Sequence, residues 1–160
     1  NSDKSINDNL IATAAAINAA YHSDAHRVTA VIPQFPYSRQ DKKKGREPLS
    51  AKIAGRLLEI SGAKHAITLD IHSEAIEGFF EKLKLQNLHM GRILLEYIAN
   101  SIEQKDLMVV APDVGSAKRG VFFAKNLGID LAIIDKVRDY SKVSVVSKMR
   151  LVGEVDGKNV

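Results

Sequence analysis

Two acidic residues and one histidine follow apolar runs of this sequence, at positions suited to binding a metal ion or a phosphate. Asp70 and His72 stand at the end of a predicted strand, residues 66–71, and Asp113 follows another, residues 107–111. Side chains two residues apart on an extended segment point to the same side, so Asp70 and His72 could reach one ion. Magnesium takes oxygen ligands and keeps waters and substrate phosphates, which favours Asp70 and Asp113 as ligands and leaves His72 to a phosphate or a bound water. The structural alternatives are a histidine hydrogen-bonded at the strand end and an aspartate that caps the next helix.

A basic segment follows the first apolar run, residues 28–32. Most of the net charge of +4 lies in residues 37–47, which contain Arg39, Lys42, Lys43, Lys44 and Arg46 against Asp41 and Glu47. A solvated face is the ordinary explanation of such a run, and the functional ones are a polyphosphate ligand or nucleic acid. Nucleic acid is the less favoured ligand, because no stacking aromatic residues are interleaved with the charges.

Lys136 and Arg138 follow the predicted strand 130–134. An arginine offers a bidentate fork to phosphate and a lysine offers a mobile point charge, which suits a loop that closes over phosphates. All four predicted strands are therefore followed by ionisable side chains. Charges that are crowded together cost free energy unless they meet partners, so we expect an anionic ligand together with a cation at these ends.

The elements that would position these residues alternate along the chain. Strands are predicted at residues 28–32, 66–71, 107–111 and 130–134, and helices at 8–21, from Pro48 to Gly62, 89–102 and 117–127. Asn7 or Asp8 should cap the first helix, and Leu49, Ile53, Leu57 and Leu58 should share the buried face of the second. The unbroken apolar run 28–32 predicts a strand buried on both faces.

Four further segments complete the chain. Residues 73–79 form a predicted helical turn, 81–87 an edge strand or a linker, 143–155 a further strand ending at Gly153, and 158–160 the start of another. Alternating strands and helices predict the α/β class, with parallel sheets and flanking helices on both faces. Ligands in such folds bind outside the carboxyl ends of the strands.

Composition limits the function classes. Of the 160 residues, 45% are hydrophobic and 26% charged, which is typical of a soluble globular protein. No apolar run approaches the ~20 residues of a membrane helix, residues 1–8 do not resemble a signal, and cysteine is absent, so we expect a cytoplasmic protein without membrane contact. Motifs for dinucleotides, Walker-type loops, nucleophile elbows and zinc proteases are absent too. His22, His26, His65 and His89 are interpreted as surface or capping residues.

Several segments, in order along the whole chain, resemble the ribose-phosphate pyrophosphokinase family. Its ATP-binding loop is resembled by residues 31–33 with 37–43, the segment after that loop by residues 46–52, and the helix before it by residues 7–10. Its metal-site stretch is resembled by residues 70–72 with 76–80, and its second acidic site by residues 112–115 with Lys118 and Arg119. The base of its flexible catalytic loop is resembled by residues 135–138. The resemblance implies two related domains of the phosphoribosyltransferase type. Residues 1–85 would be the latter part of the N-terminal domain and 86–160 the beginning of the C-terminal one, with the crossover near residues 81–90.

The same resemblance assigns roles. It implies ATP binding by Arg39, Gln40 and Asp41, magnesium near His72 with Asp70, Asp113 beside the ribose or its metal, and transition-state stabilisation by Lys136 and Arg138. The implied reaction transfers pyrophosphate from ATP to ribose 5-phosphate and releases AMP. The implied assembly is a homo-oligomer without nucleic acid or membrane.

Departures from the family pattern are also visible. The acidic, Gly/Thr-rich loop that cradles ribose 5-phosphate would follow Val160, and the family's N-terminal segment has no counterpart. Glu74 and Glu77 stand where many members have neutral polar residues linked to phosphate regulation, so we expect weak or altered inhibition by nucleotide. The alternatives are a non-catalytic regulatory member, a phosphoribosyltransferase of the same fold, and a nucleic-acid binder.

Overall fold

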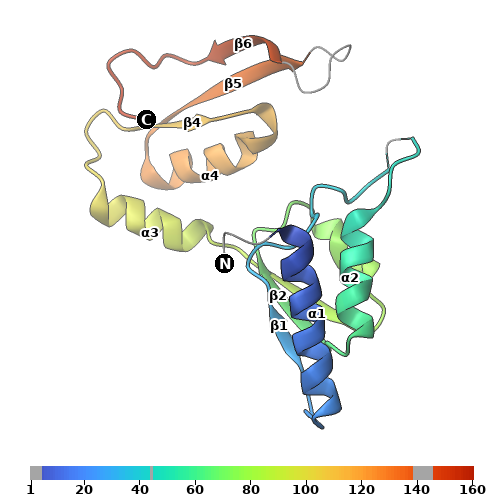
Figure 1. Cartoon of the computed structure of the whole chain (residues 1–160). Coiled ribbons are helices and arrows are strands. Elements are labelled where there is room, and N and C mark those ends of the chain that lie inside the picture. The colour runs from blue at the N-terminus through green and yellow to red at the C-terminus, as the bar shows by residue number, and fades with distance from the viewer. Residues whose placement is uncertain (1–4, 44, 139–145) are drawn as a thin grey trace. The chain divides into compact units, whose positions relative to one another are not determined.

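The computed structural model of the chain describes residues 5–43, 45–138 and 146–160, and for residues 136–138 and 146–148 the backbone alone. The chain divides into two compact units, Asn1–Met90 and Gly91–Val160, which are coloured blue to green and yellow to red in Figure 1. The division leaves the whole strand at residues 84–88 in the first unit, whereas the predicted boundary after residue 85 falls inside it. The assignment of the two units to phosphoribosyltransferase-like domains stays a prediction.

The first unit is a three-stranded parallel sheet with helices. Its elements in chain order are α1 (Ile6–His22), β1 (Thr29–Val31), α2 (Ser50–Ile60), β2 (His65–Leu69), the 3-10 helix η1 (Glu74–Phe79) and β3 (Lys84–Leu88). The strand order is β1-β2-β3, and the register aligns Thr29 with His65 and His65 with Lys84. The segment left open as an edge strand or a linker therefore contains an edge strand.

The start of α1 differs from the prediction. Neither Asn7 nor Asp8 is the cap: the Ser5 hydroxyl accepts the N–H of Asp8 at 3.1 Å, and the Asp8 carboxylate accepts the N–H of Ser5 at 3.3 Å. This is a capping box, in which two otherwise unpaired donors of the helix end are satisfied reciprocally. It fixes the first turn of α1.

The buried face of α2 was predicted wrongly in part. Ile53 is 64% exposed, whereas the side chains that face the core are Ala51, Ala54 and Leu58, together with Gly55. The reason is close packing, because a Cβ at Gly55 would lie 2.6 Å from the ring of Phe80. Small residues thus let the helix approach η1 and its neighbours.

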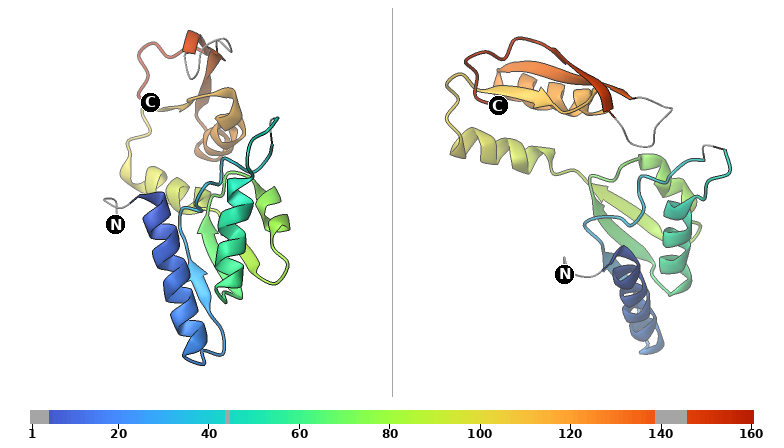
Figure 2. Two further views of the ribbon diagram at one scale, coloured as in Figure 1. Left: turned by 45° about the vertical axis from the view of Figure 1, so that its right-hand side comes forward. Right: turned by 45° about the horizontal axis from the view of Figure 1, so that its top comes forward.

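The sheet of the first unit is covered on one face in the described part of the chain. Figure 2 shows α1 and α2 side by side over the sheet, and the core between these layers includes Ile17, Ala30, Leu58 and Ala66. Val31, which points the other way, is 68% exposed. The expected burial of the first strand on both faces, and of this sheet under helices on both faces, is therefore wrong for the described residues.

The turn before β3 is held by one buried carboxylate. The side chain of Glu59 is 6% exposed, and its Oε1 accepts hydrogen bonds from the backbone N–H groups of Glu81 at 2.9 Å, Leu83 at 2.8 Å and Lys82. Its Oε2 accepts from Arg56 at 2.8 Å. Burial alone would raise the pKa of Glu59, but the hydrogen bonds from Lys82, Leu83, Glu81 and Arg56 together lower that pKa from 4.5 to about 2.

The second unit contains α3 (Gly91–Ser101), β4 (Met108–Ala111), the 3-10 helix η2 (Val114–Ser116), α4 (Ala117–Leu127), β5 (Asp130–Arg138) and β6 (Val146–Val152). The strand order is β4-β5-β6, in which β4 and β5 are parallel and β6 runs antiparallel to β5. The β4·β5 pair is parallel as expected, and β6 adds an antiparallel strand to this sheet. The first residues of the predicted strand 143–155 lie outside the described residues.

The helix α4 has the predicted bounds and ends at Gly128, whose φ of 68° is left-handed. It packs on β4 and β5 through Gly120, where a Cβ would lie 2.8 Å from Leu131. Near the end of the chain, Asn159 forms a parallel bridge with Leu107, as the predicted strand start at 158–160 requires. Among the helices that the structure describes, none is long and apolar enough to cross a membrane.

Candidate functional site

The loop after β1 carries Arg39, Gln40 and Asp41, and the first unit holds it at both ends. Phe35 is buried, and its ring meets that of Phe80 edge to face with centroids 6.2 Å apart. Further on, the N–H of Gln40 donates to the carbonyl of Tyr37 at 2.8 Å. The side chains of Arg39 and Gln40 are exposed, so this loop presents a cation and an amide on a fixed backbone.

Asp41 has an incompletely satisfied carboxylate. Its Oδ1 is buried and has no hydrogen-bond partner among the residues that the structure describes. A buried carboxylate oxygen is costly to leave unpaired, so a donor or a cation at this position would stabilise the loop. A metal ion bound together with a nucleotide would be such a cation.

The chain turns sharply at the end of β2. The strand ends at Leu69 and Asp70 has a left-handed φ of 41°, so the extended segment on which Asp70 and His72 were expected to point the same way is not formed. Instead, the N–H of Asp70 donates to the carbonyl of Leu88 at 2.9 Å, and its Oδ2 accepts the N–H of Met90 at 3.3 Å. Asp70 thus joins the carboxyl ends of β2 and β3.

His89 lies between two carboxylates that sequence reasoning did not connect with it. Its Nδ1 is 3.5 Å from Asp70 Oδ1 and its Nε2 is 3.7 Å from Glu74 Oε1, while the side chain is 65% exposed. The interpretation of His89 as a surface residue is correct for its exposure but missed these partners. No spacing signal could have found them, because β3 brings the segments together.

The predicted magnesium ligands Asp70, His72 and Asp113 stay a prediction. His72 is exposed, and within the described ranges no group of three or more His, Cys, Asp or Glu side chains is arranged to hold a metal. Asp70 and His72 belong to the first unit and Asp113 to the second. The donor chemistry still fits magnesium, which commonly uses one or two carboxylates and takes its other ligands from water and substrate phosphates.

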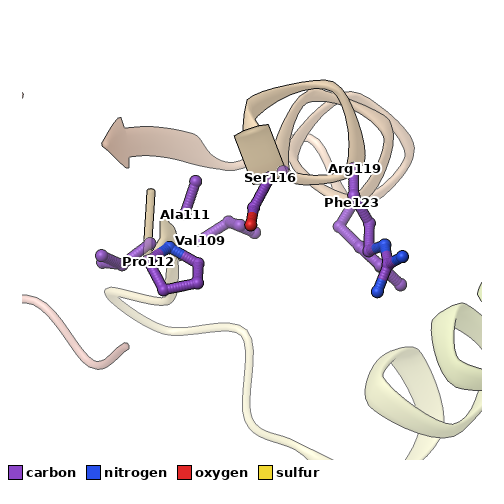
Figure 3. Close-up of a pocket in the computed structure, with 8 residues that line it drawn as sticks. Val109, Ala111, Pro112, Ser116, Arg119 and Phe123 are labelled. Atoms are coloured by element: carbon purple, nitrogen blue, oxygen red, sulfur yellow. The ribbon is translucent and has the colours of Figure 1, made fainter. Parts of the chain in front are cut away.

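Asp113 has the capping role that was its structural alternative. Its Oδ1 accepts the N–H of Ser116 at 2.8 Å and the Ser116 hydroxyl at 2.7 Å, which closes the η2 turn before α4. A shallow pocket of about 180 Å³ lies beside it. The pocket is lined by Val109, Val110, Ala111, Pro112, Ser116, Arg119, Gly120 and Phe123, most of which Figure 3 labels. Small-molecule sites usually measure about 300–1,000 Å³, so this pocket alone does not make a nucleotide site.

Lys136 and Arg138 lie within β5 and not after it. The predicted strand 130–134 is only the start of β5. Its residues Asp130–Ile133 pair with β4, and the later residues continue the strand through pairing with β6. The register aligns Lys136 with Met149 and Arg138 with Val146, with a shift between Val137 and Arg138. Their side chains lie outside the described part of the structure, as do residues 139–145.

The chain is similar to a known sequence family and to solved structures. The sequence model of the N-terminal domain of ribose phosphate pyrophosphokinase matches residues 1–62. Among solved structures, the phosphoribosylpyrophosphate synthetase from Mycobacterium smegmatis is similar, with a TM-score of 0.79 and 36% sequence identity. The match covers 93% of this chain and 47% of that synthetase, so the chain spans about half of its length.

Proposed function

Because this chain belongs to the ribose-phosphate pyrophosphokinase family, we propose that it serves the transfer of the pyrophosphoryl group of ATP to ribose 5-phosphate. The products are phosphoribosyl pyrophosphate and AMP, and the activity is that of a ribose-phosphate diphosphokinase. The observation that carries the proposal is the 36% identity with a phosphoribosylpyrophosphate synthetase across 93% of the chain. The loop after β1 agrees with it, since Arg39 is exposed and Oδ1 of Asp41 has no hydrogen-bond partner within the described ranges.

In this proposal the first unit supplies the ATP loop. Arg39, Gln40 and Asp41 bind ATP: the guanidinium of Arg39 pairs with phosphate oxygens, the Gln40 amide donates hydrogen bonds, and Asp41 accepts them or faces the metal. Asp70 and His72 would hold a magnesium ion and Asp113 would lie by the ribose or its metal, and the ion would supply positive charge to the phosphates. The chain's own residues therefore mainly bind and orient.

The reaction itself asks little covalent work of the protein. The anomeric hydroxyl of the sugar attacks the β-phosphorus of ATP, the bond to the α-phosphate oxygen breaks, and AMP leaves. Negative charge spreads over the phosphoryl oxygens in the transition state, where fixed cations stabilise it. Lys136 and Arg138 are the residues proposed for this role.

The remaining parts of the proposal concern partners and location. We propose that the protein works in the cytoplasm as a homo-oligomer, with ATP and ribose 5-phosphate as its ligands and without binding nucleic acid or membrane. The cysteine-free sequence supports the location, and the basic loop without interleaved aromatic residues argues against nucleic acid.

The full-length protein incubated with ATP, ribose 5-phosphate and magnesium tests the reaction. Phosphorus NMR should show AMP and phosphoribosyl pyrophosphate rising in equal amounts, and chelation of the metal should stop both. Formation of ADP, or of neither product, would overturn the proposal. A non-catalytic regulatory member would make no product but change the rate of a separate active synthetase.

Two variants refine the test. Arg39→Ala should raise the KM for ATP at least about tenfold, because a charge-assisted contact to phosphate contributes about 1.5–3 kcal/mol. Lys64→Ala is the matched control, since Lys64 is an exposed cation just before the amino end of β2, away from the loop. Equal effects of the two substitutions would show that Arg39 acts through general charge alone.

A further inference from the structure

Tyr37 links the loop after β1 to the first turn of α1. Its hydroxyl donates a hydrogen bond to Oδ1 of Asn7, which is 30 residues earlier in the chain. Its ring packs against the core of the first unit, and its backbone has a left-handed φ of 57°. A non-glycine residue adopts that conformation at a cost in free energy, so its surroundings must hold it there.

The other end of this link is equally fixed. Asn7 lies within the first turn of α1, between Ser5 and Asp8, which form the capping box. The Ser5 hydroxyl also donates to Asp8 Oδ2 at 2.8 Å. Asn7 is therefore presented to Tyr37 from an ordered helix end, although its own side chain is exposed.

The backbone that Tyr37 holds is the one that carries the proposed ATP ligands. The carbonyl of Tyr37 accepts the N–H of Gln40 and so closes a turn that contains Arg39. The carbonyl of Gln40 in turn accepts the N–H of Ala51 in the first turn of α2, at 3.3 Å. Movement of Tyr37 would thus shift the residues on either side of the Arg39 peptide.

We infer that Tyr37 and Asn7 are a positioning pair for ATP binding. Their hydrogen bond preorganises the turn, so that Arg39 and Gln40 meet the triphosphate without first being ordered by it. Neither residue contacts the reacting atoms, and both act through the turn. The inference rests on the proposed function, because it assigns the turn to ATP.

Variants of the full-length protein test the pair in two ways. Tyr37→Phe keeps the ring in the core and removes the hydroxyl, and Asn7→Ala removes the acceptor. Each should raise the KM for ATP about three- to tenfold, the size that one neutral hydrogen bond contributes, with kcat changed less than about twofold. The double variant should match either single one, because both remove the same bond. Asn7→Asp keeps an acceptor oxygen and should restore the wild-type KM.

Amide hydrogen exchange provides the second measurement. Exchange at the N–H of Gln40 should speed up in Tyr37→Phe and Asn7→Ala, while the amides of β2 stay protected. Tyr21→Phe is the control, since Tyr21 is a half-exposed tyrosine at the far end of α1. It should change neither the KM nor the exchange.

The outcomes separate the inference from the proposed function. If the wild-type protein does not use ATP, the proposed function fails and the assignment of the turn to ATP fails with it, whatever exchange at Gln40 shows. If the wild type is active but the variants keep its KM, or if their effects on KM multiply in the double variant, the positioning pair is refuted. Unchanged exchange at Gln40 also refutes it.

Discussion

Replacing Glu59 by glutamine should destabilise the first unit strongly, because this carboxylate is buried under four hydrogen bonds that prefer its charged form. Its pKa is lowered from 4.5 to about 2, a difference of about 2.5 units at about 1.36 kcal/mol each. The charged form of Glu59 therefore stabilises the folded state by roughly 3 kcal/mol near pH 7. Glu59→Gln keeps the size of the side chain and should lose most of this.

The pH dependence has a definite sign. A carboxyl whose pKa is lower in the folded state contributes fully above its unfolded pKa of 4.5 and loses that contribution as the pH falls toward 2. The difference in unfolding free energy between wild type and Glu59→Gln should be roughly 3 kcal/mol at pH 7 and about half of that at pH 3.

Urea unfolding followed by far-ultraviolet circular dichroism at pH 7, 5, 4 and 3 measures this difference. Glu77→Gln is the control, since Glu77 is an exposed acid in the same unit and its loss should change stability by less than about 0.5 kcal/mol. A Glu59→Gln protein as stable as the wild type at pH 7, or a stability deficit that stays constant down to pH 3, would contradict this role of the Glu59 charge.

Three further substitutions have expected outcomes. Gly55→Ala should lower the free energy of unfolding, measured in urea, by about 1–3 kcal/mol, because the new Cβ would lie 2.6 Å from Phe80. Adding Phe80→Leu should restore part of this loss. A Gly55→Ala protein with unchanged stability would contradict the close packing at this position. Asp113→Asn keeps an oxygen that can accept the Ser116 N–H, so the thermal midpoint of unfolding should stay within a few degrees of the wild type. Turnover should fall at least about tenfold if Asp113 also serves the metal or the ribose. Full activity would show that Asp113 acts only as a helix cap. Lys136→Ala should lower kcat far more than ATP affinity in steady-state kinetics, and equal losses in both would indicate ground-state binding instead.

The features that the sequence predicted well are those set by local periodicity. The apolar spacing of residues 117–127 and the glycine after them determine α4, because a helix of this length needs one apolar face and a left-handed residue at its end. The parallel pairing of β1 with β2 and of β4 with β5 also followed from the alternation of strands and helices.

The features that it missed depend on contacts between distant residues. Ile53 was assigned to the core because it is large and apolar, whereas α2 packs through alanine and glycine, which hydrophobic patterns weight little. The sequence does not reveal the direction of β6, because side chains alternate between the two faces of a strand in the same way in parallel and antiparallel pairs. The link between Asp70 and His89 exists because β3 pairs with β2, so only the fold reveals it.

For the site, sequence reasoning named residues but not their surroundings. Arg39 and Gln40 were found from charge and resemblance, and the structure adds the turn from Tyr37 to Gln40 in which both residues lie. Asp113 was read both as a ligand and as a cap, and the hydrogen bonds to Ser116 establish the cap. A role of Asp113 toward magnesium stays a proposal.

The ring of Phe80 has a consequence for how substitutions in the first unit combine. The ring contacts Phe35 at the base of the loop after β1 and packs against Gly55 of α2. Phe80 itself is the residue directly after η1, in the stretch that resembles the family's metal site. The loop after β1, α2 and the end of η1 therefore pack around one aromatic ring. Changes at positions 35, 55 and 80 should combine non-additively, and a variant that loosens one segment will loosen the others.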